Sequence, residues 1–178
     1  MQNDIFNGCT NLKTIENGRY TNFSERMFKN TGLTTLTYYA DRIPDKCFEN
    51  CSNLKDVKIE NNLVYVGSKA FYNCDSLTSV IFSENAGSEF IYKEAFAQCN
   101  LLDTVVLPNS DCYYEEKVFE GCLLSTKIEF QPLTYITGNE GNMFAECTEL
   151  SNFVADNSLA YKVENGLLVT KDGKEIVL

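Results

Sequence analysis

A phenylalanine that recurs about every 23 residues constrains the fold of this chain more than any other feature. Successive members are separated by 22, 20, 23, 25, 23 and 25 residues. The seven members are Phe6, Phe28, Phe48, Phe71, Phe96, Phe119 and Phe144. A near-constant period of this length is typical of a solenoid, in which each repeat forms one coil that stacks on its neighbours. The sequence therefore predicts a pile of about seven coils.

Other positions keep the same register as the phenylalanine. Three residues after it stands a small side chain, which is cysteine in six of the seven repeats: Cys9, Thr31, Cys51, Cys74, Cys99, Cys122 and Cys147. An L-x-x-[IVLF] element follows, as in Leu54/Val57 and Leu77/Val80, although the sixth repeat shifts it to Leu124 and Ile128. These positions predict one continuous column of cysteine side chains beside the phenylalanine column.

Each part of the repeat indicates a local structure. The run Val80-Ile81-Phe82 is short and rich in β-branched and aromatic residues, which favours one strand per coil and a parallel sheet along the stack. The run 67–71 places polar residues between Val66 and Ala70-Phe71, a pattern that predicts a helical or 3₁₀ turn opposite the sheet. The position two residues after the phenylalanine favours a left-handed residue that ends this turn. Its occupants are Gly8, Asn30, Asn50, Asn73, Gln98, Gly121 and Glu146.

Units such as 70–80 (AFYNCDSLTSV) and 95–105 (AFAQCNLLDTV) resemble the BspA-like, treponemal-type leucine-rich repeat family. The resemblance covers nearly the whole chain. It implies an α/β repeat solenoid: a right-handed leucine-rich-repeat superhelix with a parallel β-sheet on one face and short helical or 3₁₀ turns opposite. Members of this family include surface and secreted proteins of host-associated bacteria and some protozoa, for which adhesion or binding of host proteins has been proposed. Thr31 and the insertion between Thr137 and Asn142 depart from the family pattern.

The two ends of the chain depart from the regular repeat. The first unit begins at Ile5-Phe6 without the preceding apolar segment, so we expect a partial coil and a truncated start or an upstream segment. Asn165-Gly166 and Asp172-Gly173 each stand between apolar runs, which predicts a β-hairpin that caps the open sheet edge. We therefore expect a solenoid over residues 1–158 and a C-terminal hairpin cap of the same domain over 159–178. No signal peptide or membrane-spanning run is visible.

Composition narrows the function. The chain contains no histidine, so it cannot build a Ser-His-Asp or Cys-His catalytic pair or an imidazole metal site. Fifteen Lys and Arg residues against 25 Asp and Glu residues give a net charge of −10, which repels phosphate backbones and anionic lipids. We predict no catalytic residue, no cofactor, no nucleic-acid partner and no direct membrane insertion.

The eight cysteines admit three interpretations: a zinc site, disulfides or buried thiols. Cys47 and Cys51 have a C-x3-C spacing, but both fill repeat positions that have a structural role, so we predict no metal site. Stacked ladder cysteines would have parallel Cβ vectors, which disfavours disulfides, and buried reduced thiols are expected. Cys112 lies outside the ladder and is the best candidate for a reactive thiol.

The best candidate site is the outer face of the predicted sheet. If Leu54, Val57 and Ile59 point inward, alternation turns the residues between them outward. Ile81 and Val106 then become neighbours on a face that should meet solvent, where they could seed a protein-binding patch. The predicted partner-binding residues are Lys58, Ser79, Ile81, Ser83, Thr104, Val106 and Glu129. The alternative is that β-branched residues are present only because they favour strands.

These observations predict a noncatalytic protein-interaction or adhesion module that binds a protein partner through the exposed face of the sheet. The resemblance places such partners among host or extracellular-matrix proteins, and places the chain at the cell surface or among secreted proteins. The alternative is a structural spacer that displays neighbouring domains of a larger surface protein. A carbohydrate-acting enzyme would need two carboxyl groups in a deep cleft, which a regular solenoid face does not offer.

Overall fold

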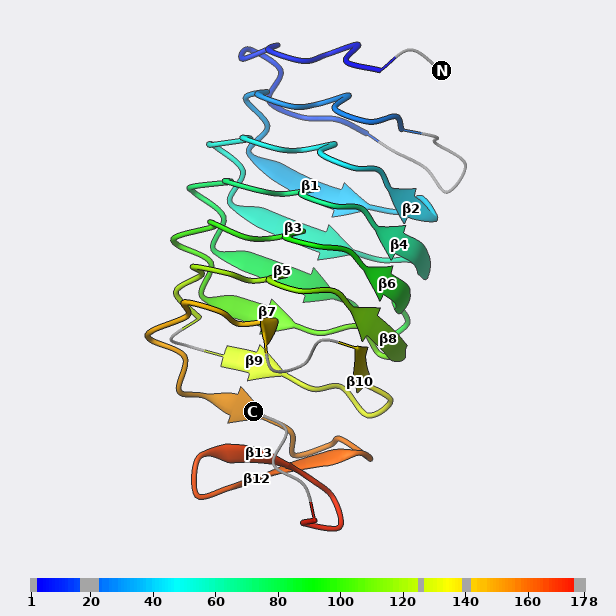
Figure 1. The fold of residues 1–178 in the computed structure, drawn as a ribbon. Coiled ribbons are helices and arrows are strands. Elements are labelled where there is room, and N and C mark those ends of the chain that lie inside the picture. Colours follow the sequence, from blue (N-terminus) through cyan, green and yellow to red (C-terminus); the bar gives the residue numbers. More distant parts are fainter. Residues whose placement is uncertain (1–2, 17–22, 125–126, 139–141, 175–178) are drawn as a thin grey trace.

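The computed structural model describes residues 3–16, 23–124, 127–138 and 142–174. Two parallel sheets run side by side along a stack of coils (Figure 1). The first sheet consists, in spatial order, of β1 (Thr35–Tyr38), β3 (Asp56–Ile59), β5 (Ser79–Phe82), β7 (Thr104–Val106), β9 (Lys127–Glu129) and β11 (Phe153–Val154). The second consists of β2 (Arg42–Ile43), β4 (Leu63–Val66), β6 (Ser88–Ile91), β8 (Asp111–Tyr114) and β10 (Tyr135–Gly138).

The first sheet confirms the predicted strand in six of the seven coils, whereas the described residues of the first coil, 3–16, contain no strand. Its register pairs Val57 with Val80 and Val80 with Val105, so one buried column runs across the strands. The second sheet is an addition to the predicted architecture. Its inward column includes Ile43, Val66 and Ile91, the apolar residues that lie five positions before a phenylalanine. A coil therefore has two sheet walls rather than one.

The third wall consists of turns, and the predicted helical or 3₁₀ turns opposite the sheet are wrong. Segments 25–30, 45–50, 68–73, 93–98 and 116–121 are continuous turns, and the described residues contain no α-helix. In the segment 45–50, Lys46 (φ 55°) and Asn50 (φ 59°) are both left-handed. A segment with two left-handed residues four positions apart cannot form a right-handed helix. The fold is therefore a repeat β-solenoid rather than an α/β one.

Backbone amides in this wall alternate between bonds within a coil and bonds to the next coil. The amide of Cys47 donates to the carbonyl of Pro44 in its own turn at 3.2 Å. The neighbouring amide of Phe48 donates to the carbonyl of Ala70 in the next coil at 2.8 Å. The left-handed residues turn successive amides in these two directions, so the turn wall is hydrogen-bonded along the stack much as a sheet is.

The left-handed residue two positions after each phenylalanine is confirmed in all seven coils. The φ angles are 78°, 57°, 59°, 57°, 58°, 72° and 60° for Gly8, Asn30, Asn50, Asn73, Gln98, Gly121 and Glu146. The asparagines at this position also form a chain of side-chain hydrogen bonds. Asn73 donates to Asn50 at 3.1 Å and Asn50 to Asn30 at 3.0 Å, and Asn30 donates at 2.9 Å to Asn7, which directly precedes Gly8. The amide side chains therefore help to set the coil spacing.

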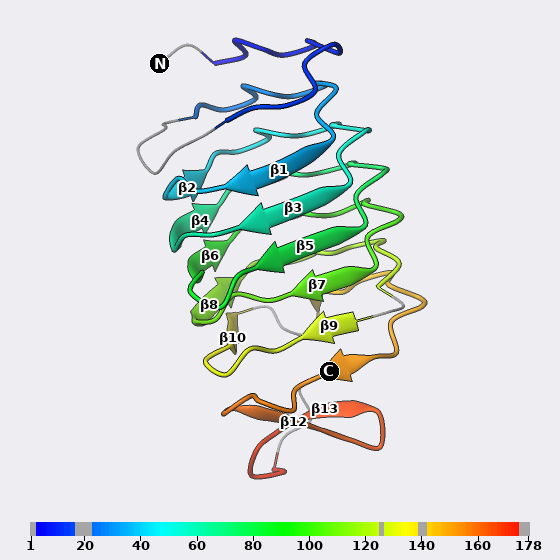
Figure 2. The same cartoon turned by 180° about the vertical axis from the view of Figure 1, so that it is seen from behind.

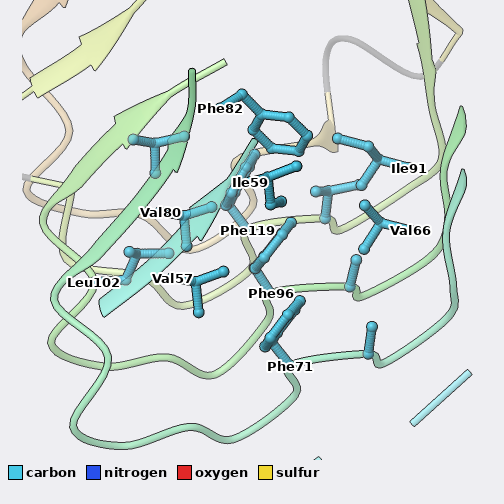
Figure 3. Close-up of a cluster of buried hydrophobic side chains, with 14 of the residues drawn as sticks. Val57, Ile59, Val66, Phe71, Val80, Phe82, Ile91, Phe96, Leu102 and Phe119 are labelled. Carbon is cyan, nitrogen blue, oxygen red and sulfur yellow. The ribbon is translucent and has the colours of Figure 1, made fainter. Parts of the chain in front are cut away.

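The seven phenylalanines form one column through the whole stack, as predicted. Successive ring centroids are 5.3, 5.5, 5.1, 5.2, 5.4 and 5.5 Å apart, and the angles between ring planes are 15° or less. Phe71, Phe96 and Phe119 stand one above another between the side chains of the two sheets (Figure 3). Such aromatic pairs contribute about 0.5–1.5 kcal/mol each beyond the burial of their surface.

A two-stranded antiparallel hairpin follows the last coil, as predicted. It comprises β12 (Tyr161–Glu164) and β13 (Leu167–Thr170), which are joined by Asn165-Gly166 with positive φ at both residues. Figure 2 places it at the end of the stack beyond β11. The Tyr161 ring lies 5.4 Å from that of Phe130, and its hydroxyl accepts a hydrogen bond from the Ile136 amide at 2.9 Å. The second turn signal, Asp172-Gly173, precedes residues 175–178, which lie outside the described residues.

The phenylalanine column predicts that a ring in the middle of the stack is worth much more than a ring at its end. Phe71 is fully buried between two rings, whereas Phe6 is 38% exposed and has one ring neighbour. Phe71→Ala should lower the free energy of unfolding by about 3–5 kcal/mol. Phe6→Ala should lower it by about 1 kcal/mol or less. Urea unfolding followed by circular dichroism measures both, and equal losses would contradict the column.

Candidate functional site

The outer face of the first sheet carries the predicted partner-binding residues. Strands β3, β5 and β7 alternate buried and solvent-facing side chains, with Val57, Val80 and Val105 inside. Six of the seven predicted residues lie in these strands or in β9, and Ser83 directly follows β5. All seven reach the solvent side of the sheet: Lys58 is exposed, and Ser79, Ile81, Ser83, Thr104, Val106 and Glu129 are partly exposed.

The strand register brings four of these residues into one row. Lys58 pairs with Ile81, Ile81 with Val106, and Val106 with Glu129. The neighbouring row contains Asp56, Ser79, Thr104 and Lys127. Ile81 and Val106 therefore form an apolar centre with a charged residue at each end of their row.

The charges around this apolar centre are satisfied within the sheet. Lys58 lies 2.6 Å from Glu60, and this hydrogen bond raises the pKa of Lys58 and lowers that of Glu60. Lys127 forms the matching pair with Glu129. Ser79 donates to Asp56 at 2.8 Å. Because each charge already has an opposite charge or a donor beside it, this face offers shape and apolar contact more than net charge.

The second sheet carries a surface that the sequence analysis missed. Tyr65 in β4, Phe90 in β6 and Tyr113 in β8 are register partners on its outer side. Tyr92, directly after β6, stands between the first two: its ring centroid lies 5.7 Å from that of Tyr65 and 6.0 Å from that of Phe90. The ring of Phe90 lies 6.2 Å from that of Tyr113. We call Tyr65, Phe90, Tyr92 and Tyr113 the aromatic row.

Each of the three strand residues of the aromatic row comes directly before an inward apolar residue, Val66, Ile91 or Tyr114. The sequence signal for the aromatic row was therefore an aromatic residue directly before each inward apolar residue. This signal is visible only if a second strand is predicted at that position, whereas the sequence analysis placed the start of a helical turn there.

Two surface hollows in the described part of the chain each contain two carboxylates. One of about 250 Å³ lies at the start of β6 and β8 and includes Glu89 and Asp111. Another of about 380 Å³ at the end of β9 includes Glu84 and Glu129, and Glu129 is paired with Lys127. The described residues contain no group of three or more potential metal-ligating side chains. They also contain no helix long and apolar enough to cross a membrane.

The ladder cysteines are free thiols, and each thiol from the third coil onward contacts the phenylalanine carbonyl of the preceding coil. The sulfur-to-oxygen distances are 3.2, 3.3, 3.2, 3.2 and 3.0 Å for Cys51, Cys74, Cys99, Cys122 and Cys147. Thr31 also places a donor at this position, but its hydroxyl donates to the Phe28 carbonyl of its own coil, at 2.8 Å. The ladder therefore combines small apolar volume with a weak donor for a buried carbonyl.

The prediction that Cys112 is the best candidate for a reactive thiol is wrong. Its side chain is fully buried on the inner side of β8, and burial raises the pKa of its thiol to about 12. A buried thiol with a raised pKa is a poor nucleophile. Cys112 is buried because β8 belongs to the second sheet, whose inner face this residue occupies.

A family comparison supports the repeat. The sequence model of the family described as BspA type leucine rich repeat region, with six copies, matches residues 1–89 and 85–167. No curated protein matches the chain.

Two solved structures are similar to this chain. One is a leucine-rich repeat protein from Bacteroides ovatus ATCC 8483, with 21% identity, a TM-score of 0.56 and coverage of 85% of this chain and 48% of that one. The other is a leucine rich cell surface protein from Faecalibacterium prausnitzii A2-165, with 24% identity, a TM-score of 0.35 and coverage of 79% and 52%. This chain thus spans about half the length of each. The first similarity supports the fold.

The thiol arrangement predicts a graded reaction with an aromatic disulfide reagent at about pH 8. Cys9 is exposed and should react first, and the half-buried Cys147, whose pKa burial raises to about 11, should react slowly. The six buried thiols should react only after unfolding. Absorbance of the released thiolate measures the phases, and Cys9→Ser should remove the fast one. A fast phase that survives in Cys9→Ser would contradict the burial.

Proposed function

The chain belongs to the BspA-type leucine-rich repeat family, and from that premise we propose that it is a noncatalytic protein-interaction or adhesion module. It binds a protein partner through the outer face of the first sheet. The observation that carries the proposal is the apolar pair Ile81 and Val106, which are register partners on a face that is otherwise polar. Extended solenoid faces of this kind commonly serve as binding surfaces.

The surroundings of this pair support a protein partner. Ser79 and Thr104 lie beside it in the neighbouring row, and Lys58 and Glu129 lie at the two ends of its own row. An apolar centre with a polar rim is the usual composition of a protein interface. Because the charges of Lys58 and Glu129 are paired within the sheet, they contribute to specificity more than to affinity.

The proposed partners are host or extracellular-matrix proteins, and the proposed location is the cell surface or the secreted fraction. Both follow from the family rather than from the site. We also propose that residues 1–158 and the hairpin at 159–178 form one domain, in which the hairpin caps the last coil. The contacts of Tyr161 with Phe130 and the Ile136 amide support this arrangement.

The double variant Ile81→Asp/Val106→Asp tests the proposed interface. Both side chains are only partly buried, so the protein should remain folded, with a melting temperature close to that of the wild type. Binding to immobilised, purified extracellular-matrix and host cell-surface proteins should fall by at least about tenfold, because two charges enter the apolar centre. Surface plasmon resonance measures the binding.

Leu159→Asp provides the control. Leu159 is 69% exposed between β11 and β12, outside both parallel sheets, so the change adds a carboxylate away from the proposed interface. It should leave binding to the same proteins unchanged. If the wild type captures none of the arrayed proteins, the chain is better explained as a spacer. Equal losses in both variants would exclude the first sheet as the specific binding face.

A further inference from the structure

We propose that the outer face of the second sheet is a separate site for an extended protein segment that carries Arg or Lys side chains. The site consists of the aromatic row together with the carboxylates of Glu89 and Asp111. It lies on a different sheet from Ile81 and Val106, so it is independent of the interface proposed above.

The rings of the aromatic row are available to a ligand and fixed in place. Phe90 is 38% exposed and Tyr113 is 43% exposed. The planes of Phe90 and Tyr92 lie at 9° to each other, so these two rings support one another. Gly138 in β10 lies under Tyr113: a Cβ there would stand 2.8 Å from a ring carbon of Tyr113. Because the glycine leaves this space free, the tyrosine ring can rest against the backbone of the next strand.

The two carboxylates that adjoin the rings in the sequence have no positive partner among the described residues. Glu89 directly precedes Phe90, and Asp111 is two residues before Tyr113. Both side chains are exposed, both line the hollow of about 250 Å³, and neither forms an ion pair within the described residues. Two cations near the row are already paired: Arg42, the register partner of Tyr65, with Asp41, and Lys93, which directly follows Tyr92, with Glu116.

Aromatic faces and free carboxylates together select a cation. A guanidinium or ammonium group over a ring is attracted by the negative face of the ring, and a neighbouring carboxylate accepts its hydrogen bonds. The same chemistry already operates within this molecule, where the Lys69 ammonium lies 4.9 Å from the centre of the Tyr72 ring. The net charge of −10 attracts a basic partner over longer distances.

The hydrogen-bonding groups of the hollow favour a cationic segment over a sugar. A sugar needs donors as well as acceptors, but the Ser110 hydroxyl donates to the Ser88 carbonyl and accepts from the Ser88 amide. The Asn109 side chain donates to the Glu84 carbonyl and accepts from the Leu133 amide. The Asn62 side-chain oxygen likewise accepts from the Gly87 amide at 2.7 Å, and the charged groups that line the hollow are the carboxylates of Glu89 and Asp111, whose oxygens accept hydrogen bonds.

The spacing of the rings fits an extended chain. Side chains two residues apart on an extended segment project to the same side at about 6.6 Å from each other. The centroids of Phe90 and Tyr113 are 6.2 Å apart, and those of Phe90 and Tyr92 are 6.0 Å apart. A segment with a basic residue at every second position can therefore place one cation over each ring.

Titration with synthetic peptides tests the site. The probe is a short peptide in which arginine alternates with serine, and binding to the full chain is measured by isothermal titration calorimetry at low ionic strength. Phe90→Leu/Tyr113→Leu keeps apolar side chains but removes the two rings, and should weaken binding by about five- to twentyfold. Glu89→Gln/Asp111→Asn keeps the shape of both side chains, and should weaken it by at least about threefold.

Asp75→Asn/Glu149→Gln is the charge-matched control, because it removes two exposed carboxylates outside the aromatic row and its hollow. It should change the affinity by less than about twofold. If this pair and Glu89→Gln/Asp111→Asn weaken binding equally, the peptide is attracted only by the net charge of the protein, and the proposed site is wrong. Unchanged binding in Phe90→Leu/Tyr113→Leu would overturn the role of the rings. If a β-linked glucose oligosaccharide binds at the aromatic row and the peptide does not, the ligand of this face is a glycan, and the proposed cationic segment is wrong.

Discussion

Each coil of this protein depends on the coils above and below it, because two short strands and a turn cannot enclose a core. Three sets of contacts repeat along the stack: the two parallel sheets, the amide bonds of the turn wall, and the column of phenylalanine rings. All three have the same direction and nearly the same spacing. A change in one coil is therefore transmitted to its neighbours, and the outer faces keep their register because the inner columns do.

The parts of the fold that could be predicted from the sequence are those in which one type of side chain recurs at the same position of each repeat. The rings, the thiols and the strands of the first sheet could be predicted because large or small apolar residues recur at one spacing. The left-handed residue after each ring was predicted where asparagine or glycine favours it. Lys46 and Lys69 are left-handed as well, with φ of 55° each. Lysine has no local preference for the left-handed conformation, which costs about 1–2 kcal/mol. At both positions it is stabilised by a backbone hydrogen bond to the next coil.

Of the two candidate surfaces, the one on the first sheet could be predicted from the sequence and the one on the second sheet could not. Ile81 and Val106 could be placed on an outer face because β5 and β7 alternate strictly. Tyr65 and Phe90 could not, because β4 and β6 each expose two successive residues between buried ends, which conceals the two-residue period of a strand. The two faces differ in chemistry, one apolar with internally paired charges and the other aromatic with free carboxylates. One core thus supports two outer faces that differ in composition.

Amide hydrogen exchange followed by NMR tests the stacking of coils most directly. The amides of Phe48, Phe71 and Phe96 each donate to a carbonyl of the following coil, at 2.8, 2.8 and 2.9 Å. If the coils form one pile, these amides exchange only when several coils open together, and they are protected as strongly as the buried strand amides of Val57 and Val80. Rapid exchange at the three phenylalanines while those strand amides stay protected would contradict the account.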